Sequence, residues 1–148
     1  MSMGEREAMT GLITTAIVLA LFLWRLSGQE AAGLFDGPDA LQTWARSVLV
    51  LVAWSIGIAI VVTIAFHVTY EVVTGEKTDD RRDERDRDIE SRAMTLAWYL
   101  LSFGLLGVIV DLALGASAFR AMNLVLALCV LSECFKDGLK IWLYRRAG

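Results

Sequence analysis

Four ionisable residues interrupt the last apolar segment of the chain. Residues 122–144 otherwise read as one membrane helix, but they include Glu133, Lys136, Asp137 and Lys140. A charged side chain at membrane depth costs about 2.5–3.5 kcal/mol on insertion scales, so such residues pair, face the interior of a bundle, or line a path for ions or protons. One-turn spacings place them as a ladder of opposite charges along one side of the helix. The ladder predicts an ion-conducting site or an ionic contact that holds helices together.

Depth along the helix distinguishes the members of this ladder. Counted from Met122 at about 1.5 Å per residue, Glu133 falls near the middle of the membrane, whereas Lys140 approaches the boundary. The lysine side chains can extend toward the boundary, where their charge is less costly. Glu133 is therefore the strongest candidate from sequence for an ion- or proton-binding group.

Two further polar residues lie at a comparable depth in another apolar segment. His67 and Glu71 are four residues apart near the end of the second segment, so a cluster with the ladder is geometrically allowed. A packed or interfacial histidine is the alternative, and one histidine with scattered carboxylates is a poor zinc site, so we expect no metal. Asp111, near the far end of the third segment, is expected to pair with Arg120 or to lie among lipid headgroups.

The elements that position these residues are four apolar segments. The chain has 148 residues, of which 56% are hydrophobic and one is proline, a composition typical of a membrane protein. A spanning helix needs roughly 20 mostly apolar residues. The sequence predicts an all-α integral membrane protein, a single domain over 1–148, with a four-helix bundle in contact with the lipid bilayer. The expected spans are 8–26, 47–70, 93–114 and 122–144.

The connections between the spans predict helix starts and orientation. Residues 36–39 read Asp-Gly-Pro-Asp, a turn that predicts a helix beginning near Asp39, ahead of the second span. Lysine and arginine are concentrated in the loop 71–92 and at Arg145 and Arg146. Short basic segments stay on the cytoplasmic side. We therefore expect both termini and the loop to be cytoplasmic.

The loop 71–92 carries acids and bases in alternation. Opposite charges four residues apart predict a solvated helix that leads into the third span. A contact with a protein partner or a gating contact is the second interpretation, and a divalent-metal site on the aspartates is the third. Balanced charge argues against nucleic-acid binding. The predicted pairs are Arg82 with Asp86, Asp83 with Arg87, and Asp88 with Arg92.

Within this loop, a charged block is formed by Asp83, Glu84, Arg85, Asp86, Ile89, Glu90 and Arg92. It is followed by the aromatic pair Trp98-Tyr99 and by a final span with an acidic residue, a lysine and a Tyr-Arg-Arg ending. This pattern resembles a family of small, uncharacterised bacterial membrane proteins. The resemblance implies a multi-pass protein of the bacterial inner membrane with four spans, and it implies no activity.

Small residues predict where helices approach closely. Ala53 and Gly57 have the small-xxx-small spacing that allows two helices to touch, and Gly104 and Gly107 are further candidates. Four helices shield little volume for several charges, so we expect a homo-oligomer whose polar faces meet.

The sequence leaves two alternative hypotheses for the function of the protein. No nucleophile elbow, zinc-protease motif or phosphate-binding loop occurs, so we expect neither an enzyme nor a bound cofactor. One hypothesis is an oligomeric ion or proton channel or transporter that uses Glu133. The other is a non-transporting scaffold or regulatory subunit that binds a partner through the charged loop and tail.

Overall fold

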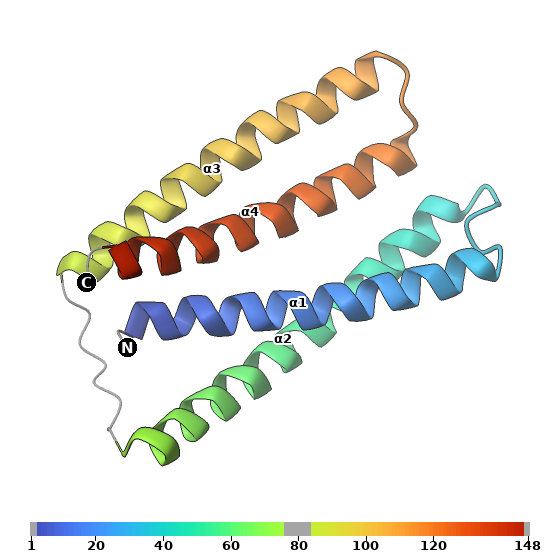
Figure 1. Ribbon diagram of the computed structural model, residues 1–148. Coiled ribbons are helices and arrows are strands. Elements are labelled where there is room, and N and C mark those ends of the chain that lie inside the picture. The colour runs from blue at the N-terminus through green and yellow to red at the C-terminus, as the bar shows by residue number, and fades with distance from the viewer. Residues whose placement is uncertain (1–2, 76–83, 147–148) are drawn as a thin grey trace.

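The computed structural model describes residues 3–75 and 84–146, and these residues form four long helices. Each helix is long and apolar enough to cross a membrane, which confirms the predicted all-α, four-span architecture (Figure 1). The helices are α1 (Met3–Ala31), α2 (Ala40–Thr74), α3 (Glu84–Ala113) and α4 (Ala118–Arg146).

At most of their ends, the helices extend beyond the spans predicted from the sequence. α2 begins at Ala40, directly after Asp39, as the turn at 36–39 predicts. It ends at Gly75, whose φ of 67° lies in the left-handed region that glycine adopts without strain, and the Gly75 N–H donates to the Glu71 carbonyl oxygen. α3 begins at Glu84, so the described part of the charged block is the first turns of a helix that then enters the membrane.

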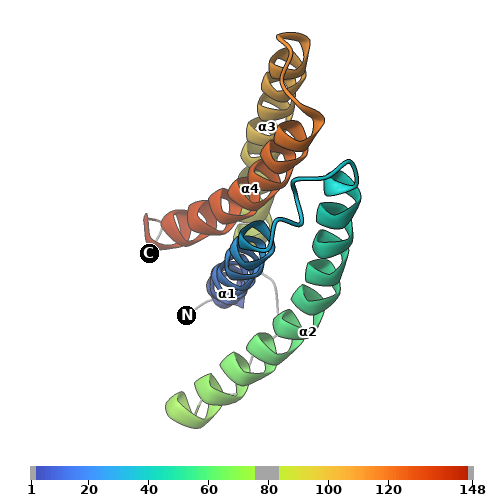
Figure 2. The same cartoon turned by 90° about the vertical axis from the view of Figure 1, so that its right-hand side faces the viewer.

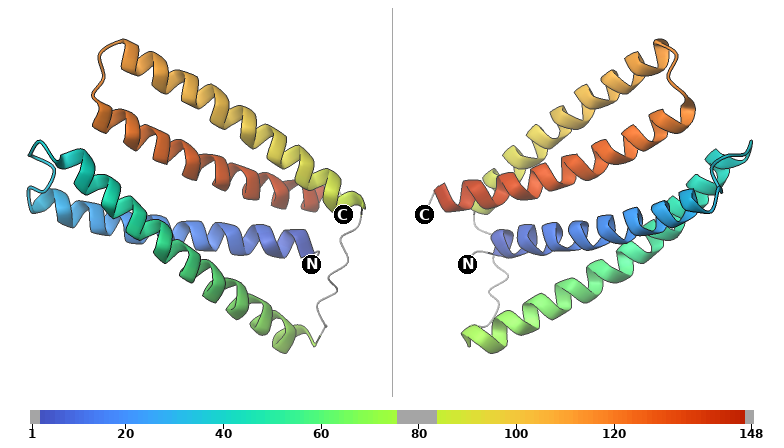
Figure 3. Two further views of the ribbon diagram at one scale, coloured as in Figure 1. Left: turned by 180° about the vertical axis from the view of Figure 1, so that it is seen from behind. Right: turned by 45° about the vertical axis from the view of Figure 1, so that its right-hand side comes forward.

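The helices pack in the order α3, α4, α1, α2, with α1 between α4 and α2 (Figures 1 and 2). α2 crosses α1 at an angle and touches α4 little, so the bundle is open between α2 and α4 (Figure 3). The N-terminus of α1 and the C-terminus of α4 lie at one end of the bundle, with the end of α2 and the start of α3 (Figure 1). We call this the terminal end, and the other the connection end.

Small side chains allow α3 and α4 to approach closely. Ala93 and Ala97 of α3 are buried, and a Cβ on Gly104 would clash with the Leu128 side chain of α4. The Ser132 hydroxyl donates to the Ala97 carbonyl oxygen across this interface, at 2.9 Å. Close backbone approach and interhelical hydrogen bonds are the main sources of helix association in a membrane.

A stripe of small residues on α1 receives α4. Gly4, Ala8 and Gly11 follow one another at one-turn intervals, and Ala8 is only 1% exposed. A Cβ on Gly4 would clash with the Tyr144 ring, and one on Gly11 would clash with the Asp137 carboxylate. The two helices run antiparallel, so the α4 residues spaced in the same way meet the α1 stripe in order.

α2 is held near its two ends. At the connection end, Trp44 is buried and its Nε1 donates to Oδ1 of Asn123 at 3.0 Å. At the terminal end, the guanidinium of Arg6 lies over the Tyr70 ring, 4.7 Å from its centre. Between these contacts, the most apolar stretch of α2 has no buried residue in the described structure.

Two of the predicted small residues, Gly57 of α2 and Gly107 of α3, make no close contact in this chain. No described atom lies within 4 Å of a Cβ built on Gly57 or on Gly107, so the predicted approach at these two positions is wrong for the single chain. Ala53 and Gly57 instead lie on a face of α2 that borders a shallow hollow with Ile17 of α1. Of the predicted glycines, Gly104 is the one that approaches a neighbour closely.

Candidate functional site

A polar cleft of about 700 Å³ lies between α1, α2 and α4 in the terminal half of the bundle. Helical spacing explains its walls, because Thr10 and Thr14 are one turn apart on α1, as are Thr63 and His67 on α2. The α4 wall carries the whole charged ladder. The polar lining residues are Glu7, Thr10, Thr14, Thr15, Thr63, His67, Glu133, Lys136, Asp137 and Lys140.

Asp137 is the most enclosed carboxylate of the ladder, because it lies where α4 packs on Gly11 of α1. Its side chain is 9% exposed and lines the cleft. It makes no hydrogen bond within the described residues, and its nearest charged partner is Lys136, with 3.9 Å between Nζ and Oδ1. Gly11 leaves the space that the carboxylate fills. A buried carboxylate with unused acceptor capacity is suited to bind a proton or a cation.

Glu133 occupies a different environment from the one its depth suggested. Its side chain is 60% exposed, and it forms an ion pair with Lys136. Lys136 is therefore shared by Glu133 and Asp137, and these three groups carry one net negative charge when all are ionised. Depth along the sequence singled out Glu133, whereas packing against α1 makes Asp137 the buried carboxylate of the ladder.

Lys140 is enclosed within the bundle, where it pairs with α3. Its side chain is 8% exposed, and its Nζ lies 3.4 Å from Oε1 of Glu90 on α3. Glu90 belongs to the charged block, so the first part of α3 turns one acid inward to pair with α4. This pair compensates the charge of Lys140.

His67 joins the ladder in the cleft, whereas Glu71 is exposed and is not among the lining residues. His67 Nδ1 lies 2.8 Å from the Thr63 carbonyl oxygen, a contact within α2. Asp111 lies apart from the cleft at the connection end, where its Oδ2 lies 3.0 Å from Nε of Arg120. The structure thus brings together five of the seven predicted intramembrane polar residues.

The charged block contributes mainly to the surface of α3. Asp88 and Arg92 form the expected exposed pair at 2.9 Å. Glu84 and Arg85 are exposed, and Asp86 is half-buried. Asp83 and the predicted pairs Arg82 with Asp86 and Asp83 with Arg87 lie outside the described residues.

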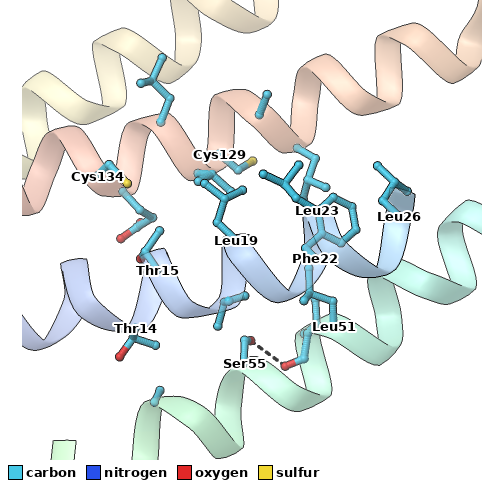
Figure 4. Close-up of a pocket in the computed structure, with 18 of the residues that line it drawn as sticks. Thr14, Thr15, Leu19, Phe22, Leu23, Leu26, Leu51, Ser55, Cys129 and Cys134 are labelled. Atoms are coloured by element: carbon cyan, nitrogen blue, oxygen red, sulfur yellow. Dashed lines mark hydrogen bonds between the residues drawn. The ribbon is translucent and has the colours of Figure 1, made fainter. Parts of the chain in front are cut away.

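An apolar groove of about 980 Å³ continues from the polar cleft toward the connection end. The two hollows share Thr14, Thr15, Ala59 and Glu133, so they form one groove between α2 and α4 with α1 along its floor. Leu19 points from α1 toward Cys129 of α4, with Phe22 further along the same helix (Figure 4). The groove is thus polar at one end and apolar at the other.

Arg6 and Asn123 are structural residues that the sequence reasoning missed. Arg6 is 4% exposed, and its Nε and Nη1 have no hydrogen-bond partner within the described residues. Both residues lie near the ends of apolar segments, where polar side chains are ordinary. Two features of the sequence could have identified these residues: an arginine close to the first span, and the single asparagine in the last span.

Metal ligation finds no support in the described residues. No three histidine, cysteine, aspartate or glutamate side chains gather there around a point that could hold a metal ion. Both cysteines are free thiols, and both line the apolar groove.

Comparison of the chain with protein-family models, curated proteins and solved structures gave no significant match. The four long apolar helices are consistent with the small four-span proteins that the charged block resembles. Membership of that family remains a prediction.

Proposed function

We propose that this four-span membrane protein moves protons or small monovalent cations across its membrane, with Asp137 as the binding group. The observation that carries the proposal is the position of Asp137. A carboxylate that is nine-tenths buried, without a hydrogen bond in the described structure, lines an open polar cleft and belongs to a helix long and apolar enough to cross a membrane. Ionisable groups in such positions commonly mark ion pathways and proton relays.

The surroundings of Asp137 support the same function. Threonine hydroxyls from α1 and α2 line the cleft and offer oxygen ligands to a cation or a chain of water molecules. Glu133, at the exposed edge, is suited to deliver ions to Asp137 because the two carboxylates share Lys136. The proposal therefore assigns Asp137 the central role and Glu133 an accessory one.

The proposed setting follows from charge distribution and size. We place the protein in a bacterial inner membrane with both termini cytoplasmic, because the basic residues of the sequence concentrate at the terminal end. We also propose a homo-oligomer, because Ala53 and Gly57 of α2 have the small-xxx-small spacing of a helix contact and no described atom lies within 4 Å of a Cβ built on Gly57. Neither residue lines the cleft or the apolar groove, so such a contact leaves the groove open to lipid. We propose no enzymatic activity.

A non-transporting scaffold or regulatory subunit is the second candidate. It is favoured by the apolar character of the groove beyond Thr14 and Glu133, which offers a small hydrated ion no polar path to the connection end in one chain. In that case the exposed charges at the start of α3 would bind a protein partner, and the ladder would hold α1, α3 and α4 together.

Flux measurements on the full chain in proteoliposomes test the proposal. Proton, Na⁺ and K⁺ fluxes should exceed those of empty vesicles, and Asp137→Asn should lower the active flux at least about tenfold, since a lost charged interaction of 1.4 kcal/mol or more has that effect. Glu133→Gln should lower it less, because the Glu133 side chain is 60% exposed.

Asp88→Asn is the matched control, because it makes the same chemical change in an exposed ion pair outside the cleft. It should retain the wild-type flux. A well-folded wild-type protein that conducts none of the three ions would contradict the proposal and favour the scaffold. Equal fluxes for Asp137→Asn and wild type would remove Asp137 from the mechanism.

A further inference from the structure

We propose that the groove between α2 and α4 binds a lipophilic organic cation, with the positive charge at Asp137 and the apolar body along Phe22. This inference rests on the proposed function, because it names the substrate class of the same carboxylate. It also gives a role to the apolar half of the groove, which a small hydrated ion would not use.

Charge selects a cation over an anion. Lys140 is paired with Glu90, and Lys136 is shared by Glu133 and Asp137, so the carboxylates of the ladder exceed the ammonium groups left to them. Asp137 is nine-tenths buried, opens on the cleft and accepts no hydrogen bond within the described residues. A ligand with one positive charge would compensate it, whereas an anion would add to the uncompensated negative charge.

The apolar half selects a lipophilic body. Its lining beyond Ala59 comes mainly from aliphatic residues of three helices together with Phe22, whose side chain is buried, and the polar exceptions include Ser55 and Asn123. Each hollow alone, about 700 Å³ for the polar one and about 980 Å³ for the apolar one, has the volume of a pocket for a drug-sized ligand, roughly 300–1,000 Å³, so the joined groove has room for a bulky ligand. Burial of apolar surface in such a groove adds to the ionic attraction.

The open side of the groove provides the entry path. α2 diverges from α4 and makes few contacts with it (Figure 2). Both helices that border the opening are long and apolar enough to cross a membrane, so we place the opening in the bilayer. A lipophilic cation partitions into the bilayer and can reach Asp137 sideways, without crossing the polar ends of the helices. A lipid anion or a second copy of the chain would compete for the same opening, and the test below separates these occupants.

Equilibrium binding of tetraphenylphosphonium to the full chain in a non-ionic detergent tests the inference. Tetraphenylborate has nearly the same size and shape and the opposite charge, so it is the matched ligand control. We expect saturable binding of the cation and none of the anion at the same concentrations. Equal binding of both ions, or preferential binding of the anion, would overturn the proposal.

Two variants localise the site. Asp137→Asn should weaken tetraphenylphosphonium binding at least about tenfold, by loss of the charged partner. Ala59→Phe fills the junction of the two hollows and leaves Asp137 in place, so it should weaken binding even if Asp137→Asn fails to fold. Ile60→Phe is its control, because Ile60 is 56% exposed and lines neither hollow. Wild-type affinity in a folded Ala59→Phe protein would contradict the assignment.

The two proposals fail in different ways. Tetraphenylphosphonium binding that depends on Asp137 and Ala59 supports the ligand class even in a protein that shows no proton, Na⁺ or K⁺ flux. Ion flux that depends on Asp137, in a protein that does not bind the cation, overturns the ligand class and leaves the ion-transport proposal standing. Gel filtration shows whether a second copy of the chain dissociates when the cation binds. If tetraphenylphosphonium bound to the wild-type protein only when a second copy dissociated, the groove would be an interface between copies and the proposal would be wrong.

Discussion

The carboxylate of Asp137 lies against Gly11, at the place where any other residue would carry its Cβ. α1 can pack this closely on α4 because the residues of its small-residue stripe, Gly4, Ala8 and Gly11, have no bulky side chains. The same contact shields Asp137 from lipid and holds it on the wall of the cleft. The position of the proposed binding group therefore depends on a residue that takes no part in the chemistry.

Substitution of Gly11 by valine should push α1 and α4 apart. Overpacking a tight contact costs about 1–3 kcal/mol, so we expect Gly11→Val to lower the free energy of unfolding by that amount in a detergent titration. Gly28→Val is the control within the same helix, because no described atom lies within 4 Å of a Cβ built there. Equal stability of the two variants would show that α1 and α4 are not in close contact at Gly11.

The pair of Lys140 and Glu90 should show energetic coupling. Removal of the Glu90 charge leaves the enclosed Lys140 without this ion pair, and removal of Lys140 takes the same ion pair from Glu90. Lys140→Met or Glu90→Gln alone should therefore destabilise the protein by about 1–3 kcal/mol. The double variant should lose less than the sum of the two, and unfolding free energies of the four proteins measure the difference. Strict additivity would mean that the 3.4 Å contact contributes nothing.

Ser132 should stabilise the contact between α3 and α4. Its hydroxyl donates to the Ala97 carbonyl oxygen on the neighbouring helix, and interhelical hydrogen bonds in membranes average about 0.6 kcal/mol. Ser132→Ala should reduce the unfolding free energy by about that amount. Ser55→Ala should change it less, because the Ser55 hydroxyl bonds to the Val52 carbonyl oxygen of its own helix. The reverse order of the two effects would contradict the structure.

A double-mutant cycle on Trp44 and Asn123 should locate the attachment of α2 at the connection end. Trp44→Phe keeps an aromatic ring and removes the indole N–H, while Asn123→Leu removes the acceptor. We expect a coupling free energy of about 0.6 kcal/mol, the average for such bonds in a membrane protein, and no more than about 1.7 kcal/mol, the largest value found there. Zero coupling in unfolding experiments would mean that α2 is held at this end by packing alone.

The helices themselves could be predicted from the sequence because their signals are local. Runs of apolar residues predict four spans, and the turn at 36–39 predicts the start of α2 within one residue. These features depend on composition over short stretches. Backbone hydrogen bonding within each helix then follows, since a spanning segment has no other way to satisfy its polar groups.

The choice between Glu133 and Asp137 could not be made in this way. Both lie one turn apart or less from Lys136, and depth alone favours Glu133. Burial is decided by the part of α4 that meets Gly11, a residue more than a hundred positions earlier. Register between helices is a property of the packed structure, and the same reason hides the contacts of Arg6 with Tyr70 and of Trp44 with Asn123.

The small-residue stripe of α1 also has a consequence for biosynthesis. α4 is the least apolar of the four candidate spans, with a mean hydropathy of 1.6 over its most apolar window, and it carries the charged ladder. Such a segment enters a bilayer at a cost when it is alone. α4 also leaves the ribosome after α1, the helix that carries Gly4, Ala8 and Gly11. The surface that covers Asp137 is therefore made before Asp137 itself, so the order of synthesis offers α4 a partner on arrival in the membrane.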